Sequence, residues 1–274
     1  MWIKHYFIMP EALQKAGVGT FEQAMNLRGK AFRDVPGRKT MQIALGSKSY
    51  FIKQHFGVGW GEIIKNLISF KKPILGAMTE VNAIQKLAEI DIPTTRLVAY
   101  GQQGCSPACF NIASLQSFVM TEDLGDIVSL EELSVGWQEK PQAFKQKLMQ
   151  ELAQLAGKLH AAGLCHRDFY LCHFVIKKQD LDNQHLYLYL IDLHRVLQGQ
   201  KVNSRPVMKD IAGLYFSAKQ CGLSADDLKV FKQHYLPKSH AFWAQVETRA
   251  EVLLAKFNSE KFQKRLSAEQ SALD

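Results

Sequence analysis

Two aspartates in the middle of the chain could carry out proton or metal chemistry: Asp168, in a loop that an apolar stretch follows, and Asp192, at the end of another apolar stretch. A carboxylate in a loop can accept the proton of a hydroxyl group, and a carboxylate at the end of a strand can bind a divalent cation. Further upstream, Lys53 ends a strand-like segment and Glu80 begins a helical one. A lysine held by a glutamate can bind the phosphates of a nucleotide. These four residues together predict phosphoryl transfer.

The stretch around Asp168 is the most informative part of the sequence. It contains the tripeptide His166-Arg167-Asp168, which is the signature of the kinase catalytic loop. The aspartate of that signature accepts the hydroxyl proton of the acceptor substrate. We expect Asp168 to be the catalytic base, with His166 and Arg167 as further catalytic residues and Arg167 ordering the loop. The signature has a metal-binding Asn where this chain has His173. His173 therefore either binds the metal or positions Asp168 or Asp192 by a hydrogen bond.

The segments up to Lys53 predict an antiparallel meander of three strands, over residues 31–35, 40–45 and 49–53. In kinases the lysine of the third strand binds the α- and β-phosphates of ATP, and we expect Lys53 to do so. Glu80 begins a predicted helix over residues 79–88, which Thr79 could cap. It suits the glutamate that pairs with this lysine. A first-turn glutamate favoured by the helix dipole is the alternative.

The turn between the first two strands is poor in glycine. Kinases place several glycines there, so that backbone N–H groups can approach the phosphates. This sequence offers Gly37, with Arg38 and Lys39 beside it. We expect Arg38 and Lys39 to bind ATP in place of part of the missing backbone cradle, and a solvated basic turn is the alternative.

Two further predicted strands, over residues 95–100 and 117–121, lead into a polar linker. The linker begins with Thr121, Glu122 and Asp123. An apolar strand that runs into a polar linker is typical of the hinge of a two-lobed kinase, whose backbone binds the adenine ring. We therefore expect these three residues to contact ATP.

The linker also predicts where the chain divides. Residues 1–124 would form an N-terminal extension and a small, nucleotide-binding lobe, and residues 125–274 a large, helical catalytic lobe. The expected fold class is α+β, a bilobal protein-kinase-like fold with an antiparallel sheet and a helix in the first lobe. Residues 21–27 are polar and moderately amphipathic, and we expect the N-terminal extension that contains them to pack on the body of the protein. Further helices are predicted over residues 62–68, 129–133 and 144–162, the last ending at Gly163.

Asp192 ends a predicted hairpin, whose strands cover residues 174–176 and 186–191. Kinases place the magnesium-binding aspartate of their Asp-Phe-Gly motif at this point, whereas this chain continues with Leu193 and His194. We expect Asp192 to bind Mg²⁺, and an ordinary turn residue is the alternative.

A basic loop is predicted next, over residues 195–208, and it contains Arg195, Lys201 and Arg205. We expect these cations to bind phosphate or carboxylate groups of the acceptor, with a solvated loop as the alternative. A helix is predicted from Lys209 onward. Its Asp210 has a structural role in this interpretation, either as a cap or as a residue that ties down the catalytic loop.

Composition limits the class of protein. The chain has 47% hydrophobic residues and a net charge of +8, which indicates a globular protein whose surface favours anionic partners. Its basic residues are spread along the chain, which argues against nucleic acid. The five cysteines, Cys105 and Cys109 among them, are odd in number and scattered, as in reduced cytosolic proteins. Without a signal-peptide pattern or a long apolar segment, we expect a cytoplasmic protein, soluble or held peripherally at a membrane.

With these elements placed, the sequence resembles the lipopolysaccharide core heptose(I) kinases, the WaaP/RfaP family of bacterial kinase-like enzymes. The most specific likeness lies in two segments, Tyr170-Leu171-Cys172-His173-Phe174 and Ile191-Asp192-Leu193-His194-Arg195. Ordinary protein kinases lack both. Further segments follow in the order of the family, over residues 49–53, 62–67, 73–77, 80–84, 121–124, 160–163 and 210–217.

The resemblance implies transfer of the γ-phosphate of ATP, with Mg²⁺, to O4 of the first heptose of the lipid-linked lipopolysaccharide inner core. It also implies peripheral contact with the cytoplasmic face of the inner membrane, and acyl carrier protein as a partner. The resemblance also implies that the His and Asp at the metal site of the family correspond to His173 and Asp192.

Three alternatives stay open. A kinase for another core sugar, Kdo or the second heptose, would use the same catalytic residues. A pseudokinase that only binds is favoured by the glycine-poor turn and by His173, and is opposed by the intact set of Lys53, Glu80, Asp168 and Asp192. A small-molecule kinase of the aminoglycoside type shares the architecture but fits the specific segments less well.

Overall fold

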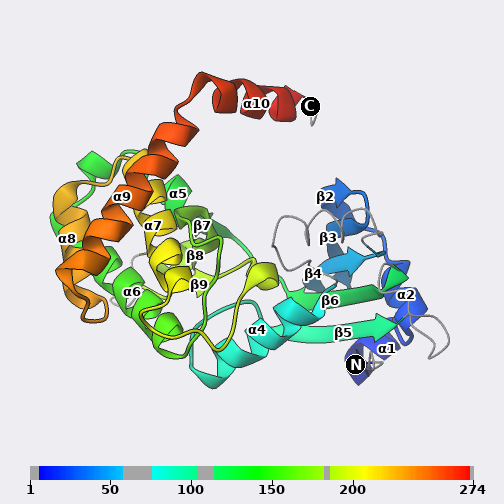
Figure 1. Ribbon diagram of the computed structural model, residues 1–274. Helices are drawn as coiled ribbons and strands as arrows, with labels where there is room; N and C mark the ends of the chain where they lie inside the picture. Colours follow the sequence, from blue (N-terminus) through cyan, green and yellow to red (C-terminus); the bar gives the residue numbers. More distant parts are fainter. Residues whose placement is uncertain (1–5, 58–75, 104–113, 182–185, 272–274) are drawn as a thin grey trace. The chain divides into compact units, whose positions relative to one another are not determined.

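The computed structural model describes residues 6–57, 76–103, 114–181 and 186–271 (Figure 1). The chain folds into two compact units. Unit 1 comprises Met1–Gly125 and Asp192–Val196, and unit 2 comprises Asp126–Ile191 and Leu197–Asp274. The predicted helix over residues 62–68 and the cysteines Cys105 and Cys109 lie outside the described residues. The assignment of nucleotide binding to residues 1–124 and of catalysis to residues 125–274 stays a prediction.

Unit 1 is built on a six-stranded antiparallel sheet with the strand order β1-β5-β6-β4-β3-β2. Its strands are β1 Tyr6–Ile8, β2 Lys30–Val35, β3 Arg38–Leu45, β4 Lys48–His55, β5 Leu97–Gln103 and β6 Gln116–Glu122. Its helices are α1 Glu11–Lys15, α2 Phe21–Met25, α4 Met78–Glu89 and a 3-10 helix over Leu193–Arg195. The predicted meander is confirmed as β2, β3 and β4. Gly37 and Gly46 have positive φ at its two turns, a conformation that glycine adopts without strain.

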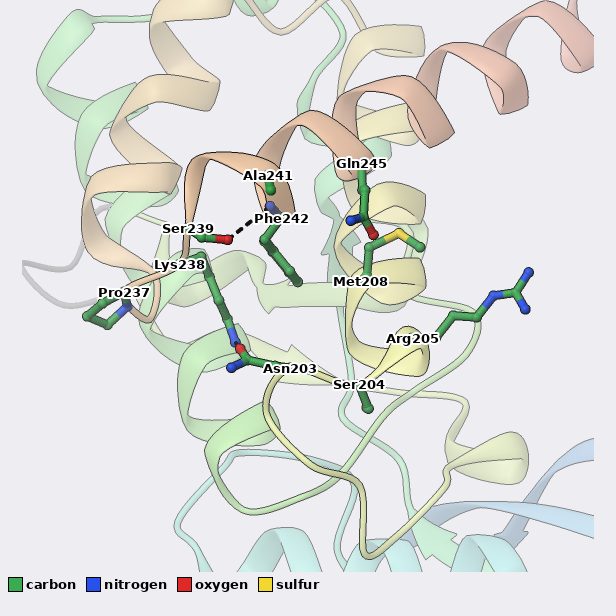
Figure 2. A pocket seen from close by; sticks show the side chains of 10 residues that line it. All are labelled: Asn203, Ser204, Arg205, Met208, Pro237, Lys238, Ser239, Ala241, Phe242 and Gln245. Carbon is green, nitrogen blue, oxygen red and sulfur yellow. Dashed lines mark hydrogen bonds between the residues drawn. The ribbon is translucent and has the colours of Figure 1, made fainter.

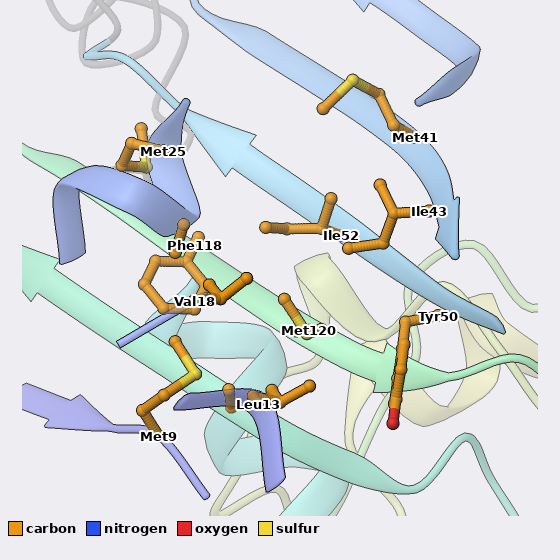
Figure 3. Packing of buried hydrophobic residues seen from close by; sticks show 12 residues of the cluster. Met9, Leu13, Val18, Met25, Met41, Ile43, Tyr50, Ile52, Phe118 and Met120 are labelled. Carbon is orange, nitrogen blue, oxygen red and sulfur yellow. The ribbon is translucent and has the colours of Figure 1, made fainter. Parts of the chain in front are cut away.

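The N-terminal segment forms part of the core of unit 1 (Figure 3). Apolar side chains that precede the meander pack with those of the sheet, and they are Met9, Leu13, Val18, Ala24 and Met25. They meet Met41, Ile52, Phe118 and Met120, which come from three different strands. The side-chain amide of Gln54 also donates to the carbonyl oxygens of Ala24 and Met25, at 2.9 and 3.1 Å. The predicted packing of this segment on the body of the protein is therefore confirmed.

Helix α4 begins at Met78 and not, as predicted, at a Thr79 cap. Its N-cap is Ala77, which has no capping side chain of its own. The backbone N–H of Ala77 instead donates to the hydroxyl of Ser117 on β6, at 2.9 Å. Gly76 lets the backbone come this close, because a Cβ atom there would lie 2.5 Å from the same hydroxyl. A contact with the sheet thus sets the start of the helix, and sequence capping rules do not register such a contact.

Unit 2 combines a small antiparallel sheet with helices. The sheet has the order β7-β8-β9, with β7 Ile127–Ser129, β8 Phe174–Lys177 and β9 Tyr189–Leu190. The α-helices are α5 Leu130–Leu133, α6 Gln142–Ala161, α7 Arg205–Gln220, α8 Ala225–His234, α9 His240–Phe257 and α10 Glu260–Ser271. Short 3-10 helices cover Trp137–Glu139, Leu171–His173 and Lys178–Asp180. Helix α8 packs on α6, and α9 packs on α7.

Several boundaries in unit 2 match the sequence patterns and two do not. Gly163 follows α6 with a φ of 74°, as its predicted terminating role requires. Strand β9 covers only Tyr189–Leu190 of the six residues predicted. Helix α7 begins at Arg205, four residues before the prediction, because Pro206 suits the first turn of a helix. None of the described helices is long and apolar enough to cross a membrane.

Candidate active site

Lys53 is the centre of a charged cluster in unit 1. It lies in β4, where its backbone is opposite Thr40 of β3 and Val119 of β6. Its Nζ atom contacts Glu80 Oε1 at 2.7 Å and Asp192 Oδ1 at 2.9 Å. The side chains of Lys53, Glu80 and Asp192 are 17%, 6% and 28% exposed. The predicted ion pair with Glu80 is therefore present, and Asp192 joins it.

The contacts within this cluster keep Lys53 and Asp192 charged. Burial alone would lower the pKa of Lys53, but the carboxylates of Glu80 and Asp192 raise that pKa above its usual value. Burial alone would raise the pKa of Asp192, but the hydrogen bond with His194 and the charge of Lys53 hold it well below its usual range. The contact from His194 Nδ1 to Asp192 Oδ1 measures 2.8 Å. An ionised carboxylate oxygen is the ligand that Mg²⁺ prefers, so Asp192 fits the predicted metal role.

The backbone of Asp192 is also unusual. Its φ is 61°, in the left-handed region that residues other than glycine rarely adopt. Such a conformation costs free energy and persists only where the surroundings impose it. The contacts with Lys53 and His194 are the surroundings that hold this aspartate in place.

Arg38 and Lys39 separate in the structure. Arg38 lies opposite His55, on the face of the sheet that carries Lys53, and its Nη2 atom is 3.9 Å from Asp192 Oδ1. Lys39 lies on the other face, where its Nζ atom pairs with Asp34 at 2.8 Å. The buried Nε atom of Arg38 has no hydrogen-bond partner among the described residues. An unsatisfied cationic donor fits a phosphate oxygen. The structure thus brings Arg38, and not Lys39, to the predicted phosphate site.

His55 belongs to the same group and was not predicted from the sequence. Burial lowers the pKa of His55 to about 3, and the nearby Arg38, Lys53 and His194 add to the effect. Its position two residues after Lys53 in one strand was the available signal, because such residues share a face of the sheet. A neutral imidazole here adds no further positive charge beside Arg38 and Lys53.

The predicted hinge residues serve mostly the fold of unit 1. The carboxylate of Asp123 accepts hydrogen bonds from Gln42 Nε2 at 2.6 Å, from the Ser49 hydroxyl at 2.7 Å and from the N–H of Gly125 at 2.9 Å. Glu122 pairs with Arg96 and Lys48, and Thr121 is buried in β6.

The backbone N–H groups of this hinge are also engaged. Those of Glu122 and Asp123 donate to the carbonyl oxygens of Arg96 and Ser49, at 2.9 and 3.1 Å. An adenine ring bound at this hinge would therefore have to form hydrogen bonds with the backbone carbonyl groups of these residues, or with backbone N–H groups later in the chain.

In unit 2, His166 anchors the catalytic loop. Its ring is fully buried, and Nε2 lies 2.9 Å from the carbonyl oxygen of Ile191. A carbonyl only accepts, so Nε2 donates this hydrogen bond. Burial lowers the pKa of His166. A buried ring that bonds to the backbone does not reach substrate, so the structure makes His166 a positioning residue and not, as predicted, a catalytic one.

Asp210 ties the catalytic loop to α7, which is one of the two roles predicted for it. Its carboxylate accepts the backbone N–H groups of His166 and Arg167, at 2.6 and 2.9 Å. Arg167 has a φ of 74°, so the loop is held in a strained conformation at the residue before Asp168. Helix α7 begins five residues earlier, which excludes a capping role for Asp210.

A buried cluster of His160, Cys165 and Asp210 surrounds this contact. Their candidate ligand atoms lie within 4.8 Å of one another. Burial and the charge of Asp210 raise the pKa of the Cys165 thiol, so it stays protonated, and Asp210 already accepts two hydrogen bonds. The cluster therefore acts as a structural network and not as a metal site.

His173 is fixed by the catalytic loop itself. Its Nδ1 atom lies 2.6 Å from the backbone carbonyl oxygen of Asp168, which also accepts the N–H of Tyr170 at 3.0 Å. Because the carbonyl only accepts, Nδ1 carries the hydrogen of this contact. His173 thus positions Asp168 through its backbone, and its role toward a metal stays a prediction.

The three predicted acceptor-binding cations do not share one segment. Arg195 belongs to unit 1, in the 3-10 helix after Asp192, whereas Lys201 and Arg205 belong to unit 2. Arg205 is the first residue of α7 and not part of a loop. Their role toward an acceptor stays a prediction.

Comparison with known proteins decides what kind of site this is. The model of the lipopolysaccharide kinase (Kdo/WaaP) family matches residues 22–235. The chain belongs to this family. It is 39% identical, over 80% of its length and 81% of the relative's, to the lipopolysaccharide core heptose(I) kinase WaaP of Pseudomonas aeruginosa. It is 36% identical, over 82% and 84%, to the enzyme of that name from Escherichia coli K12.

A solved structure, titled WaaP in complex with acyl carrier protein, matches with a TM-score of 0.73 and 32% sequence identity. The match covers 90% of this chain and 99% of the solved chain. The predicted protein-kinase-like fold and the predicted family are thereby confirmed. As a member of the lipopolysaccharide kinase family, the chain is a phosphotransferase, and the residues around Lys53 and Asp168 are its candidate active-site residues.

Proposed function

We propose that this chain phosphorylates the first heptose of the lipopolysaccharide inner core at O4, with ATP as the phosphoryl donor. The observation that carries the proposal is the cluster of Lys53, Glu80 and Asp192 in a chain that also holds an anchored His166-Arg167-Asp168 loop. A protein that does not bind phosphate groups has no need for charged groups buried at this cost, because each has to be desolvated. The heptose specificity is supported by the relatives, which are named heptose(I) kinases.

In the proposed reaction, Lys53 and Arg38 bind phosphate oxygens of ATP, and Glu80 keeps Lys53 extended. Asp192 would hold Mg²⁺, which supplies charge neutralisation on the transferred phosphoryl group. Asp168 orients the heptose hydroxyl and takes its proton as the oxygen bonds to phosphorus. Phosphoryl transfer needs little covalent chemistry from the protein, so most of the rate comes from this positioning.

We further propose that the enzyme works in the cytoplasm, peripherally at the inner membrane, where a lipid-linked core would be presented. The net charge of +8 suits an anionic membrane surface and an anionic acceptor. Acyl carrier protein is a proposed partner, since the related solved structure is a complex with it.

The decisive experiment incubates the purified protein with ATP, Mg²⁺ and core lipid from a strain that lacks this kinase. Mass spectrometry of the core should then show one added phosphate on the first heptose. Asp168→Asn should abolish the product while leaving the secondary structure unchanged, and Lys39→Gln is the matched control that should leave it intact. A phosphate on Kdo or on the second heptose would replace the proposed acceptor.

A pseudokinase gives a different result. It would show no product with any core lipid. Stabilisation by ATP with Mg²⁺, measured as a shift in melting temperature and lost in Asp192→Ala, would then report nucleotide binding alone.

A further inference from the structure

A pocket of about 720 Å³ opens in unit 2 between the first turns of α7 and α9 (Figure 2). From α7 and the residues before it come Asn203, Ser204, Arg205 and Met208, and from α9 and the residues before it come Pro237, Lys238, Ser239, Ala241, Phe242 and Gln245. Polar groups thus surround a short apolar floor of Met208 and Phe242. Small-molecule sites combine apolar side chains with polar groups that orient the ligand, and this pocket has both.

Two cations stand at different ends of this pocket. The side chain of Lys238 reaches toward Asn203, whereas Arg205 extends from the other side (Figure 2). The Nζ atom of Lys238 donates to Val202 O at 2.6 Å and to Asn203 Oδ1 at 2.7 Å. Both acceptors are neutral, and Nζ also lies 5.0 Å from the centre of the Phe242 ring, so these contacts supply no carboxylate to neutralise the ammonium charge. Burial lowers the pKa of Lys238, as expected for a charge without a carboxylate partner.

The positive charge continues along α7 and α9 beside the pocket. Lys209 lies one turn after Arg205 on α7, and Arg249 lies one turn after Gln245 on α9, so both extend the faces that line the pocket. Among the residues that the structure describes, Arg205, Lys209 and Arg249 have no ion pair with a carboxylate. Burial lowers the pKa of Lys209, and the cations Arg205, Arg249 and Arg167 lower it further. Because Arg167 immediately precedes Asp168, this basic region adjoins the catalytic loop.

A hydroxyl group of the pocket is also unsatisfied. Ser204 is the N-cap of α7, but its hydroxyl makes no capping hydrogen bond. Its buried Oγ atom has no partner in the described part of the chain. Like charges gathered beside unsatisfied polar groups destabilise a protein on its own, and an anionic ligand removes that cost.

We propose that this pocket binds anionic groups of the acceptor saccharide, carboxylates or phosphates, with one anion at Arg205, beside Lys209 and Arg249, and another at Lys238 at the other end. The inference rests on the proposed function, because it takes an acidic core saccharide as the acceptor. Of these four residues, only Arg205 was predicted from the sequence to bind the acceptor. Lys209, Lys238 and Arg249 are additional. By binding the acceptor in this way, these residues orient it so that its reacting hydroxyl group faces Asp168.

The test compares steady-state kinetics of two charge-matched variants on core lipid. Arg205→Gln/Lys209→Gln/Arg249→Gln should raise the KM for core lipid by about 10-fold, as expected for three partly screened charge contacts, while the KM for ATP stays within about 2-fold. Lys229→Gln/Lys256→Gln/Lys261→Gln removes the same net charge from exposed positions elsewhere in unit 2 and should leave both constants unchanged. Lys238→Gln, which keeps a donor for Val202 O, should raise the KM for core lipid as well.

Two altered acceptors identify the anion. Core lipid whose phosphates have been removed and core lipid whose carboxylates have been reduced to alcohols are each compared in the wild type and in the triple variant. The difference between the two proteins should vanish with whichever acceptor lacks the recognised group. Equal KM values for core lipid in the two triple variants would overturn the inference, as would an undiminished difference with both acceptors. Absence of wild-type activity on heptose would instead reject the proposed function.

Discussion

Lys53 is the residue on which the charges of unit 1 converge. It compensates two carboxylates at once, Glu80 at 2.7 Å and Asp192 at 2.9 Å. Removing one partner of such a buried group is costly because the other charge stays desolvated, whereas removing both partners is often tolerated. The cluster is therefore more readily explained by its use in binding phosphate than by stability alone.

Lys53→Met tests this charge balance. It leaves Glu80 and Asp192 without their shared cation, so we expect the opening free energy of β4 and α4 to fall by about 3 kcal/mol. Adding Glu80→Gln should restore part of the loss, because one uncompensated carboxylate is then gone. Hydrogen exchange of the β4 and α4 amides measures both values. Lys39→Met, which breaks only a pair with the exposed Asp34, should cost less than about 1 kcal/mol. A double variant less stable than the single one would contradict the argument.

His55 makes the stability of unit 1 depend on pH. Its pKa is about 3 in the folded chain, below its usual 6.5, so between these values the unfolded chain binds a proton that the folded chain does not. Stability contributed through His55 is therefore complete above pH 6.5 and falls with pH, by up to about 1.4 kcal/mol per unit. Hydrogen exchange of β4 at pH 7 and pH 5 should show the loss, and His55→Asn should flatten it. A slope unchanged in His55→Asn would disprove this origin, and His240→Asn, at an exposed site, serves as the control.

At the scale of elements, one face of α7 holds the catalytic loop. Asp210 accepts two backbone N–H groups of the loop, and Ser217 Oγ accepts the N–H of Leu171 at 3.1 Å. Between them, Gly213 lets Tyr170 approach, since a Cβ atom there would lie 3.2 Å from its ring. These three positions recur at the spacing of a single helix face. The loop geometry is thus imposed by a helix that lies later in the chain.

Tyr235 extends this support to the end of α8. Its hydroxyl lies 2.8 Å from His160 Nδ1, and His160 Nε2 lies 3.4 Å from Asp210 Oδ2. The carboxylate of Asp210 has no hydrogen to give, so Nε2 carries one, and Nδ1 can accept from Tyr235. Burial raises the pKa of Tyr235, which keeps the phenol protonated and able to donate. The tyrosine therefore fixes the imidazole that faces Asp210.

Tyr235→Phe should lower kcat by about 5-fold, as expected if about 1 kcal/mol of support for the loop is lost, and should leave the KM for ATP unchanged. The matched control is Tyr215→Phe. Tyr215 is equally buried and packs on the same Phe231 and Trp243, but its hydroxyl bonds to the carbonyl oxygen of Leu228. It should lose stability without losing kcat. Equal kcat values in the two variants would show that Tyr235 acts only through packing.

Elements with a local cause were predictable from the sequence. The meander follows from alternation and glycine turns, the end of α6 from Gly163, and the start of α5 from the Ser129 and Glu132 capping box. The Lys53 and Glu80 pair was found because a known motif fixes their order. Tertiary contacts set what was missed: the pairing of β1 with β5, the start of α4 on Ser117, and the support of His160 by Tyr235. Such contacts join residues far apart in the chain and leave no local pattern.

At the scale of the whole molecule, the chain does not divide at one point. The first part of unit 1 ends at Gly125, and the chain then forms part of unit 2. It returns to unit 1 for Asp192–Val196 before it continues in unit 2. The contacts of Asp192 with Lys53 and His194 lie within that unit. Asp192 therefore belongs to the unit that contains the proposed phosphate-binding residues, whereas Asp168 belongs to unit 2. A single boundary at residue 124 could not express this arrangement.

Each unit also has its own core, which gives a reciprocal pair of variants. Leu13→Ala opens a cavity under the sheet of unit 1, and Leu152→Ala opens one in α6 of unit 2; the two leucines are 2% and 1% exposed. Either should cost about 2 to 5 kcal/mol. Because a chain of two units need not unfold in one step, the loss has to be measured by element. Hydrogen exchange should accelerate in β4, β5 and β6 for Leu13→Ala, and in α6 and α8 for Leu152→Ala.

Only Leu13→Ala should weaken stabilisation by ATP, since Lys53 and Asp192 are in its unit. Acceleration of both sets of amides in both variants would mean that the two units unfold as one.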